Sequence, residues 1–379
     1  MTACGRAKSY PTQQAVIFSR VSQENLQEEL FRPPAPVRRQ DWHLSRMVHG
    51  RKPMTANTAV DRSPPPAWPA YLALLDNGEL ERRVVEAYAR LDDCDLCARY
   101  CRVNRRQTLK GVVCRTGERA VVHGCCPHHG EENPLRGWAG SGTIFFSWCN
   151  LRCVFCQNWE ISQQGEGQEI TSEALARMML DLQRHGCHNI NLVTPSHVVP
   201  QILAATLLAA RWGLRLPLVY NTGGYDSPEA LALLDGVVDI YMPDMKYGDS
   251  QTAHRYSHVR NYWEVNQAAV REMHRQVGDL TLDEHGLARR GLLVRHLVLP
   301  GDLANTETVL AFLAREISTD TWLNLMDQYH PCYKSGDYPP LDRPLAREEY
   351  EQALRLAEKY GLRRLDQRRR WREWGRGSG

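Results

Sequence analysis

The chain has 379 residues and carries 47 Lys and Arg against 44 Asp and Glu, a formal net charge of +3 at pH 7. This near balance argues against a dedicated nucleic-acid binder, which needs a one-sided field. The length allows one large α/β domain with a smaller module, and no apolar run predicts a membrane span or a secretory signal. We therefore expect a cytoplasmic protein without membrane contact, whose 12 cysteines serve metal or redox chemistry rather than disulfides.

The first part of the chain lacks the pattern of a large folded domain. Residues 1–65 carry scattered Pro, Arg and Gln without a sustained apolar period, and we expect a disordered extension there. Residues 66–140 start with one amphipathic helical pattern (YLALLDNGELERRVVEAYARL) and continue as a stretch rich in Cys, Gly and Pro. This stretch has too few periodic apolar residues for a large core, so it predicts a small metal-binding module.

Four cysteines of this module are spaced as a possible ligand set. Cys94, Cys97, Cys101 and Cys114 follow the pattern C-x2-C-x3-C-x12-C, and we call them the four-cysteine site. Four thiolates suffice for one closed site, which is either a structural zinc ion or a second [4Fe–4S] cluster able to relay electrons. A module without metal is the third option.

A short run after these cysteines also carries possible functional side chains. His128 and His129, with the acidic pair Glu131 and Glu132, could serve a substrate or only end the module. The adjacent Cys125 and Cys126 have no convincing ligand spacing. We assign no catalytic role here.

Residues 141–335 alternate short β-rich runs with helical patterns, which is typical of βα units around a parallel sheet. Strands are expected at 142–147, 188–194, 216–221, 238–242, 292–299 and 321–326. One helix is well delimited, with Ser227 as N-cap, Pro228 at its first position and Gly236 just past its end. Six strands are few for a closed eight-stranded barrel, so we expect a partial (β/α)6 barrel or an open parallel sheet with active groups at the carboxyl ends of the strands.

Three further cysteines follow the first of these expected strands. Cys149, Cys153 and Cys156 form the array C-x3-C-x2-C in SWCNLRCVFCQNW, and we call them the three-cysteine array. A cubane [4Fe–4S] cluster with only three cysteine ligands leaves one iron free to bind another molecule. A structural zinc ion with His197 or Cys187 as fourth ligand is the alternative, although the spacing departs from the usual C-x2-C zinc pairs.

The three-cysteine array, with Phe155 just before its last cysteine, resembles the signature of radical S-adenosylmethionine (SAM) enzymes. The flanking segments add to the likeness, and they are PHHGEENPLRG, GSGTIFFSWCNLRCVFCQNWEIS, NINLVTPSHVVP, LPLVYNTGGYDS, VDIYMPDMKYGD, LLVRHLVLPG and NLMDQYHP. Over about residues 70–332 the chain resembles the PflX-type proteins, relatives of the pyruvate formate-lyase activating enzymes.

This resemblance implies a radical SAM barrel with a [4Fe–4S] cluster whose open iron is chelated by SAM. It also implies a one-electron reductant such as flavodoxin or ferredoxin. In that family the reduced cluster breaks SAM into methionine and a 5′-deoxyadenosyl radical, which abstracts hydrogen from a substrate.

The resemblance further implies which residue lies near the adenine and where the backbone passes close to SAM. Phe155 is expected near the adenine. Asn221, Gly223 and Gly224 are expected at the end of the third strand, where small residues let the chain pass close to SAM.

Charged positions are implied at the ends of the fourth and fifth strands. Asp244 and Lys246 match an Asp-x-Lys element that lies beside the amino acid moiety of SAM in the activating enzymes, with a plain strand-end ion pair as the alternative. Arg295 and His296 match positions that line the SAM pocket. Because side chains alternate along a strand, only one of these two should face inward, and we favour His296.

One element of many radical SAM enzymes is absent from this sequence. A Gly-Gly-Glu element that binds the methionyl amine usually ends the second strand, and here that strand ends in Thr194-Pro195-Ser196-His197. Ser196 or Thr194 could supply the missing oxygen acceptor. His197 is either a substrate-side group or purely structural.

The end of the chain, residues 336–379, is expected to form a helix and a basic tail. Seven Arg oppose one Asp and one Glu between positions 363 and 376, and two Trp are interleaved. A solvated tail and a contact to a partner protein or nucleic acid are both open.

The expected function is reductive cleavage of SAM followed by hydrogen abstraction from a substrate that the sequence does not identify. Activation of a protein partner, as in the related activating enzymes, is one option, and no catalytic side chain is assigned. The alternative function is a non-catalytic zinc or iron–sulfur scaffold or electron carrier.

Overall fold

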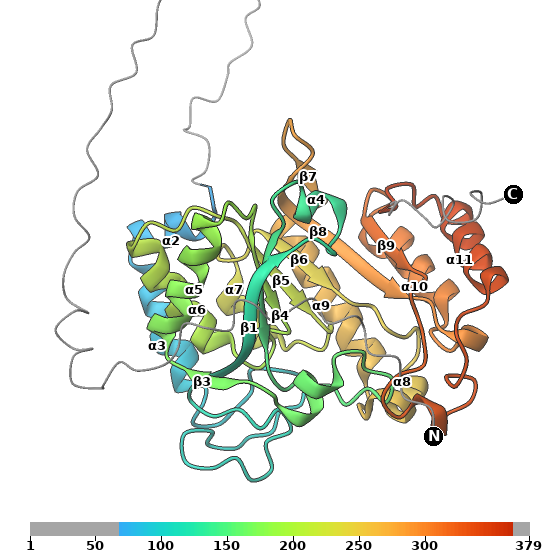
Figure 1. The fold of residues 1–379 in the computed structure, drawn as a ribbon, viewed down its shortest axis with the longest axis horizontal. Coiled ribbons are helices and arrows are strands. Elements are labelled where there is room, and N and C mark those ends of the chain that lie inside the picture. Colours follow the sequence, from blue (N-terminus) through green and yellow to red (C-terminus); the bar gives the residue numbers. More distant parts are fainter. Residues whose placement is uncertain (1–67, 367–379) are drawn as a thin grey trace, which may run out of the picture. The chain divides into compact units, whose positions relative to one another are not determined.

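The computed structural model describes residues 68–366, so the expected extension over residues 1–65 and most of the basic tail lie outside the described chain. A nine-stranded sheet forms the centre, and six of its neighbouring strands run parallel (Figure 1). In their order across the sheet these are β2 (Ser141–Phe146), β4 (Ile190–Val193), β5 (Leu218–Thr222), β6 (Ile240–Pro243), β8 (Ala288–Leu297) and β9 (Trp322–Met326). All six expected strands are present, which confirms an α/β fold with a partial (β/α)6 barrel.

Three further strands extend the sheet and were not expected from the sequence. β1 (Ala120–His128) pairs antiparallel with β2 and with β3 (Gln168–Ile170), and β7 (Thr281–Leu282) pairs antiparallel with β8. Gly124, two cysteines and Pro127 interrupt the apolar alternation of β1 and hide it as a strand. Through β1 the cysteine-rich stretch is joined to the edge of the parallel sheet.

The amphipathic pattern at the start of the described chain forms two helices rather than the single one expected. α2 (Tyr71–Asp76) and α3 (Glu79–Ala89) are separated by Asn77 and Gly78, and Gly78 has a φ of 76°. A positive φ ends a right-handed helix, and glycine adopts it at least cost. Both helices pack against α6 (Val199–Arg211), which in turn packs against α5 (Ser172–Arg184).

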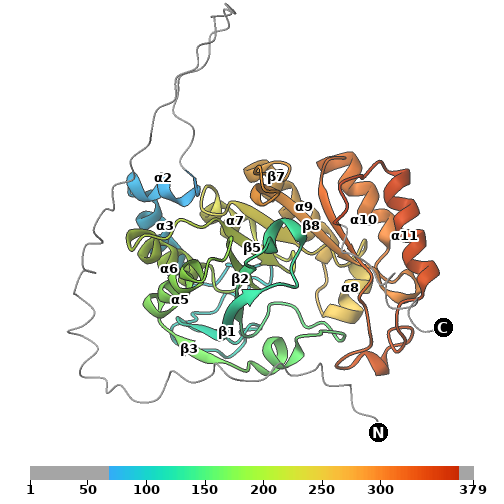
Figure 2. The same ribbon diagram turned by 45° about the horizontal axis from the view of Figure 1, so that its top comes forward.

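The other helices follow the strands in the βα order that the sequence predicts. They are α4 (Asn133–Arg136), α7 (Pro228–Leu234), α8 (Ser250–Ser257), α9 (Tyr262–Val277), α10 (Thr306–Phe312) and α11 (Arg347–Lys359), with shorter turns at η1 (Glu160–Gln164), η2 (Pro300–Asp302), η3 (Leu313–Ile317) and η4 (Ser335–Asp337). α10 and α11 lie side by side at one end of the molecule (Figure 2). The expected start of α7 is confirmed, because Ser227 Oγ accepts a hydrogen bond from the Ala230 amide over 3.3 Å.

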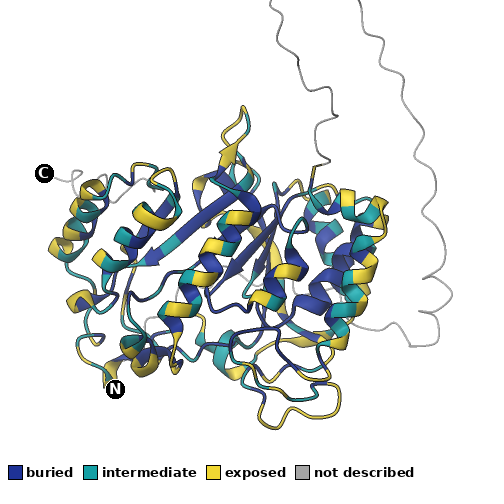
Figure 3. Ribbon diagram, turned by 180° about the vertical axis from the view of Figure 1, so that it is seen from behind, coloured by how far each residue is buried: buried dark blue, intermediate teal, exposed yellow. Residues whose placement is uncertain are grey.

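The parallel strands form the interior of the described chain. Figure 3 shows them almost wholly buried, while the surrounding helices turn exposed faces outward. Within residues 68–366 the helices are all too short or too polar to cross a membrane.

Candidate functional site

One cavity of about 400 Å³ opens at the carboxyl ends of the parallel strands. Each of the six strands contributes to its lining at or just beyond its end, through Phe145, Thr194, Asn221, Asp244, Arg295 and Met326. This is the edge of a parallel sheet where loops gather and where enzymes of this architecture place their reactive groups.

All three thiols of the three-cysteine array line this cavity. Their loop follows β2, and nearby groups donate to the sulfurs. The Ser257 hydroxyl donates to Cys153 Sγ over 2.9 Å, and the Leu151 amide donates to Cys149 Sγ over 3.4 Å. Hydrogen bonds of this kind stabilise the anionic form of a sulfur ligand.

The array fits a polynuclear metal centre. Burial raises the pKa of Cys149 to about 12 and that of Cys156 to about 11, and the neighbouring thiolates also raise both. Such thiols keep their protons at neutral pH unless a metal displaces them. In the described residues no three Cys, His, Asp or Glu side chains are grouped to hold a single metal ion. A cubane cluster binds each thiolate at a different iron and does not require the sulfurs to meet at one centre.

An ion-pair network forms the wall of the cavity beside the three-cysteine array. Asp244 accepts from Arg295 Nε at 2.8 Å through Oδ1 and from Lys246 Nζ at 2.6 Å through Oδ2. Arg295 Nη2 also donates to Asn221 Oδ1 over 2.7 Å. Burial raises the pKa of Asp244, but Arg295 and Lys246 outweigh burial and hold that pKa below its usual value. The structure thus brings together four of the residues expected around SAM.

Two residues that the sequence analysis missed hold this network in place. The Tyr262 hydroxyl donates to the carbonyls of Gly223 (2.9 Å) and Asp244 (3.0 Å) and accepts from the Lys246 amide (3.0 Å). Asn266 Nδ2 donates to the carbonyls of Gly224 and Asp244. Both lie on α9, and the spacing of four between them is the only signal in the sequence that could have paired them.

The two glycines after β5 have different places. Gly223 lines the cavity, and a Cβ added there would lie 2.9 Å from the Leu151 side chain. Gly224 lies behind the cavity with a φ of +74°, and a Cβ there would lie 2.2 Å from Asn266 Nδ2. Gly224 therefore requires glycine, whereas a Cβ at Gly223 would require the Leu151 side chain to shift, and only Gly223 lines the cavity.

The residues at the end of β4 divide between the cavity and the core. Thr194 lines the cavity, whereas Ser196 is buried with its hydroxyl 2.9 Å from Thr222 Oγ1. His197 is buried with Nε2 3.0 Å from the Ser147 carbonyl, and burial lowers its pKa to about 3. His197 and Cys187 both lie outside the cavity lining, which disfavours either as a fourth ligand of a zinc ion at the three-cysteine array.

The expectation that His296 rather than Arg295 faces inward is wrong. His296 is fully buried, with Nδ1 2.6 Å from the Met245 carbonyl and Nε2 3.0 Å from Thr306 Oγ1. Burial lowers its pKa to about 4, so it is neutral at pH 7. The alternation along β8 therefore places Arg295 in the cavity and His296 behind it.

Phe155 and further polar groups complete the lining. Phe155 is buried in the cavity wall with its ring edge-on to Tyr247 and Tyr329. His128 and Glu131 also line the cavity, with Nε2 and Oε1 4.0 Å apart. Glu132, the neighbour of Glu131, is buried and accepts from Asn324 Nδ2 over 2.6 Å. His129 does not line the cavity.

Five polar residues of the lining were not singled out from the sequence. They are Gln157, Asn158, Ser162, Gln163 and Gln328. The first two directly follow the last cysteine of the array, which is the only local signal that could have marked them.

The four-cysteine site lies in the loops between α3 and β1. Cys94, Cys97 and Cys114 are buried, and Cys101 is half-buried. Burial raises the pKa of Cys97, and the nearby thiols of the other three cysteines also raise it. The four thiols are thus near enough to influence one another, and a shared metal site stays a prediction.

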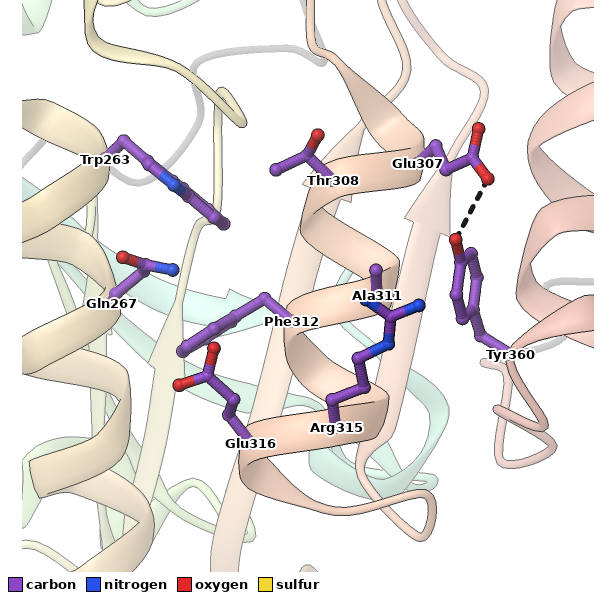
Figure 4. Close-up of a pocket in the computed structure, with 9 residues that line it drawn as sticks. All are labelled: Trp263, Gln267, Glu307, Thr308, Ala311, Phe312, Arg315, Glu316 and Tyr360. Atoms are coloured by element: carbon purple, nitrogen blue, oxygen red, sulfur yellow. Dashed lines mark hydrogen bonds between the residues drawn. The ribbon is translucent and has the colours of Figure 1, made fainter.

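A second pocket, of about 380 Å³, lies on the surface between α9, α10 and the end of α11 (Figure 4). Its acidic groups are engaged, because Glu307 accepts from Tyr360 and Lys359, and Glu316 pairs with Arg271. No thiol lines this pocket. It does not compete with the cavity as a reactive site.

Comparison with known proteins agrees with the geometry of the cavity. The family model of the radical SAM superfamily matches residues 143–289, which hold the three-cysteine array and most of the parallel strands. The solved structures of methylornithine synthase (PylB) and of TYW1 with a lysine-pyruvate adduct bound are similar at TM-scores of 0.39 and 0.38, with 16% and 11% identity. They cover 78% and 57% of this chain, and this chain covers 73% of each. At these scores the likeness carries no weight for function.

Two curated proteins of Methanocaldococcus jannaschii are also similar to the chain. The uncharacterized protein MJ0674 is 34% identical over 277 residues, covering 71% of this chain and 75% of the relative. The uncharacterized protein MJ0808 is 26% identical over 302 residues, covering 73% of this chain and 82% of the relative. The chain belongs to the radical SAM superfamily, whose enzymes use a [4Fe–4S] cluster and S-adenosylmethionine.

Proposed function

We propose that this protein is a cytoplasmic radical SAM enzyme in which Cys149, Cys153 and Cys156 bind the SAM-binding cluster, and that its substrate is a protein. The observation that carries the cluster assignment is the single cavity that collects all three thiols with Asp244, Lys246 and Arg295. When bound, the cluster and SAM supply a one-electron cleavage that yields a hydrogen-abstracting radical.

The side chains of the cavity suit the amino acid moiety of SAM. Arg295 and Lys246 offer cations to its carboxylate, and Asp244 holds both in fixed positions through hydrogen bonds of 2.8 and 2.6 Å. Thr194 takes the place where many relatives have an acidic residue, and its hydroxyl is the acceptor available to the amine.

Phe155 supports the position of the adenine. Its ring lies in the wall beside the third cysteine and is fixed by edge contacts to Tyr247 and Tyr329. A fixed aromatic face gives a planar base a packing surface without loss of side-chain entropy on binding.

A protein substrate is the option favoured by the likeness to the activating enzymes. His128, Glu131, Gln157 and Gln328 add polar groups to the cavity lining, where peptide groups could hydrogen-bond. The alternative, a non-catalytic scaffold, does not account for a cavity that combines thiols, an ion-pair network and further polar groups.

Deuterium transfer tests the proposal. The reduced enzyme is incubated with SAM and an extract from cells grown in deuterated medium, and the 5′-deoxyadenosine is analysed by mass spectrometry. We expect label from the fraction that a filter retains as protein. Label from the small-molecule fraction alone would contradict a protein substrate, and absence of 5′-deoxyadenosine would contradict the enzyme.

A further inference from the structure

A buried arginine accompanies the four-cysteine site. Arg105 is 2% exposed, and its Nη1 lies 3.6 Å from Cys94 Sγ. Its other nitrogens donate to the carbonyls of Thr116, Gly117 and His197. Among the described residues, the ionisable groups that act most on this guanidinium are Cys114, Cys94 and Cys97, and a buried charge is costly unless an anion is near. Cys94 Sγ is the side-chain atom that this guanidinium reaches, so the charge of Arg105 lies against the four-cysteine site.

Two arginines join the four-cysteine site to the loop of the three-cysteine array. Arg99, between two ligands of the former, donates Nε to the Asn150 carbonyl over 2.7 Å. Arg152, between two ligands of the latter, donates Nη2 to the carbonyl of Val113, the residue before Cys114. Each bridge spans a single side chain, so the two cysteine groups are close neighbours.

The surface between the two groups is open to solvent. A hollow of about 680 Å³ lies there, with Val112, Val113, Trp148 and Arg152 in its lining. Trp148 precedes the first ligand of the three-cysteine array, and Val113 precedes the last ligand of the four-cysteine site. A redox protein seated at this hollow would be near both groups.

The spacing of the four cysteines along the chain favours a cluster over zinc. A structural zinc ion brings four sulfurs to one centre at about 2.3 Å each. The pattern C-x2-C-x3-C-x12-C lacks the second C-x2-C pair of a zinc ribbon. The four-cysteine site contains the same C-x3-C step as the three-cysteine array, which a zinc ribbon does not need.

We propose that Cys94, Cys97, Cys101 and Cys114 bind a second [4Fe–4S] cluster, which passes single electrons to the cluster at the three-cysteine array. The proposal rests on the proposed function and adds the route of its electrons. Four cysteine ligands leave no iron open to SAM. One electron arrives from a carrier of the flavodoxin or ferredoxin class and the same electron then leaves for the first cluster, so the second cluster returns to its oxidised state and no proton moves.

Metal content of matched variants tests the site. One variant replaces Cys149, Cys153 and Cys156 by Ala, and the other replaces Cys97 and Cys114 by Ala. After anaerobic reconstitution we expect about eight irons and eight sulfides in the unaltered protein and about four of each in either variant. Of the two variants, only the one that keeps the three-cysteine array should show a SAM-dependent change in the paramagnetic resonance spectrum of the reduced protein.

The outcomes separate this proposal from the proposed function. One zinc ion and no sulfide in the variant that lacks Cys149, Cys153 and Cys156 would overturn the second cluster, as would zinc in the unaltered protein as isolated. Loss of the SAM response in the unaltered protein would instead overturn the proposed function and leave the second cluster intact.

A reduction experiment tests the route of the electrons. After rapid mixing with reduced ferredoxin, the paramagnetic resonance signal of the SAM-binding cluster gives its rate of reduction. This rate should be lower by a factor of about ten or more in the Cys97 and Cys114 double variant than in the unaltered protein. An equal rate would overturn the relay.

Discussion

Arg295 donates Nε to Asp244 Oδ1 over 2.8 Å, across the neighbouring parallel strands β6 and β8. The same carboxylate holds Lys246, so one acid fixes two cations at the wall of the cavity. The side chains of all three are largely buried, at 13–21% exposure. Loss of the acid therefore leaves two poorly hydrated cations without their partner.

The Asp244→Asn variant should lose SAM binding. Asn keeps the size of the side chain but removes the charge that orients Lys246 and Arg295, so we expect SAM affinity to fall about tenfold or more. The measurement is the SAM-dependent change in the paramagnetic resonance spectrum of the reduced cluster. Asp226→Asn is the matched control, because Asp226 is also buried but lies behind the cavity, bonded to Tyr220 and Thr222. Equal effects of the two variants would contradict a role of Asp244 in SAM binding.

Neighbouring residues on β8 should separate SAM binding from stability. Arg295→Lys keeps the charge but loses the planar fork that reaches both Asp244 and Asn221, so KM for SAM should rise with little loss of folding free energy. His296→Asn removes a buried ring between Met245 and Thr306 and should lower the unfolding free energy by about 2 kcal/mol. Kinetics and urea unfolding of both variants check this, and a raised KM in His296→Asn alone would refute the orientation of β8.

Two buried histidines should make the fold sensitive to mild acid. The pKa is lowered to about 4 in His296 and to about 3 in His197, mainly by burial. Because the unfolded chain takes up protons near pH 6.5 and the folded chain does not, the stability present above pH 6.5 is lost as the pH falls towards 4. The loss is on the order of 3 kcal/mol for His296. Unfolding free energies at pH 7 and pH 5 should differ less in His296→Asn than in the unaltered protein, and an unchanged pH dependence would speak against neutral burial.

Two glycines with the same backbone conformation should respond differently to alanine. Gly224 and Gly236 have φ of +74° and +73°, so alanine at either position should lower the unfolding free energy by about 1–2 kcal/mol because of the left-handed backbone. At Gly236 the new Cβ would lie 3.5 Å from Leu74, an ordinary contact. At Gly224 it would lie 2.3 Å from the Asp244 carbonyl, so Gly224→Ala should be destabilised by about 2 kcal/mol more. Equal unfolding midpoints would show that the Asp244 strand end is not packed against Gly224.

The parallel core was predictable because each of its strands is an apolar run between turn signals. β5 and β6 illustrate this, since their buried residues stand in unbroken order and their ends carry the polar site residues. β1 was not predictable, because Gly124 and Pro127 break its pattern and only pairing with β2 and β3 makes it a strand.

The candidate site was predictable where the residues lie next to a strand end or within a cysteine array. The side of β8 that faces the cavity was not, because Arg295 and His296 are both polar and alternation alone does not say which is inside. The Arg295 guanidinium lies inward because it donates there to Asp244 and Asn221. These partners precede Arg295 in the sequence by 51 and 74 positions. Tyr262 and Asn266 were missed for the same reason, since their partners are distant in the sequence.

The most direct test is SAM cleavage by the reduced, cluster-loaded protein, with Cys153→Ala as the variant and Cys187→Ala as the matched control. Cys187 is a buried cysteine outside the cavity lining. We predict that the unaltered protein and Cys187→Ala release methionine and 5′-deoxyadenosine, and that Cys153→Ala releases neither. Release of 5′-deoxyadenosine by Cys153→Ala at the unaltered rate, or its absence from a fully loaded and reduced unaltered protein, would contradict the assignment of the three-cysteine array.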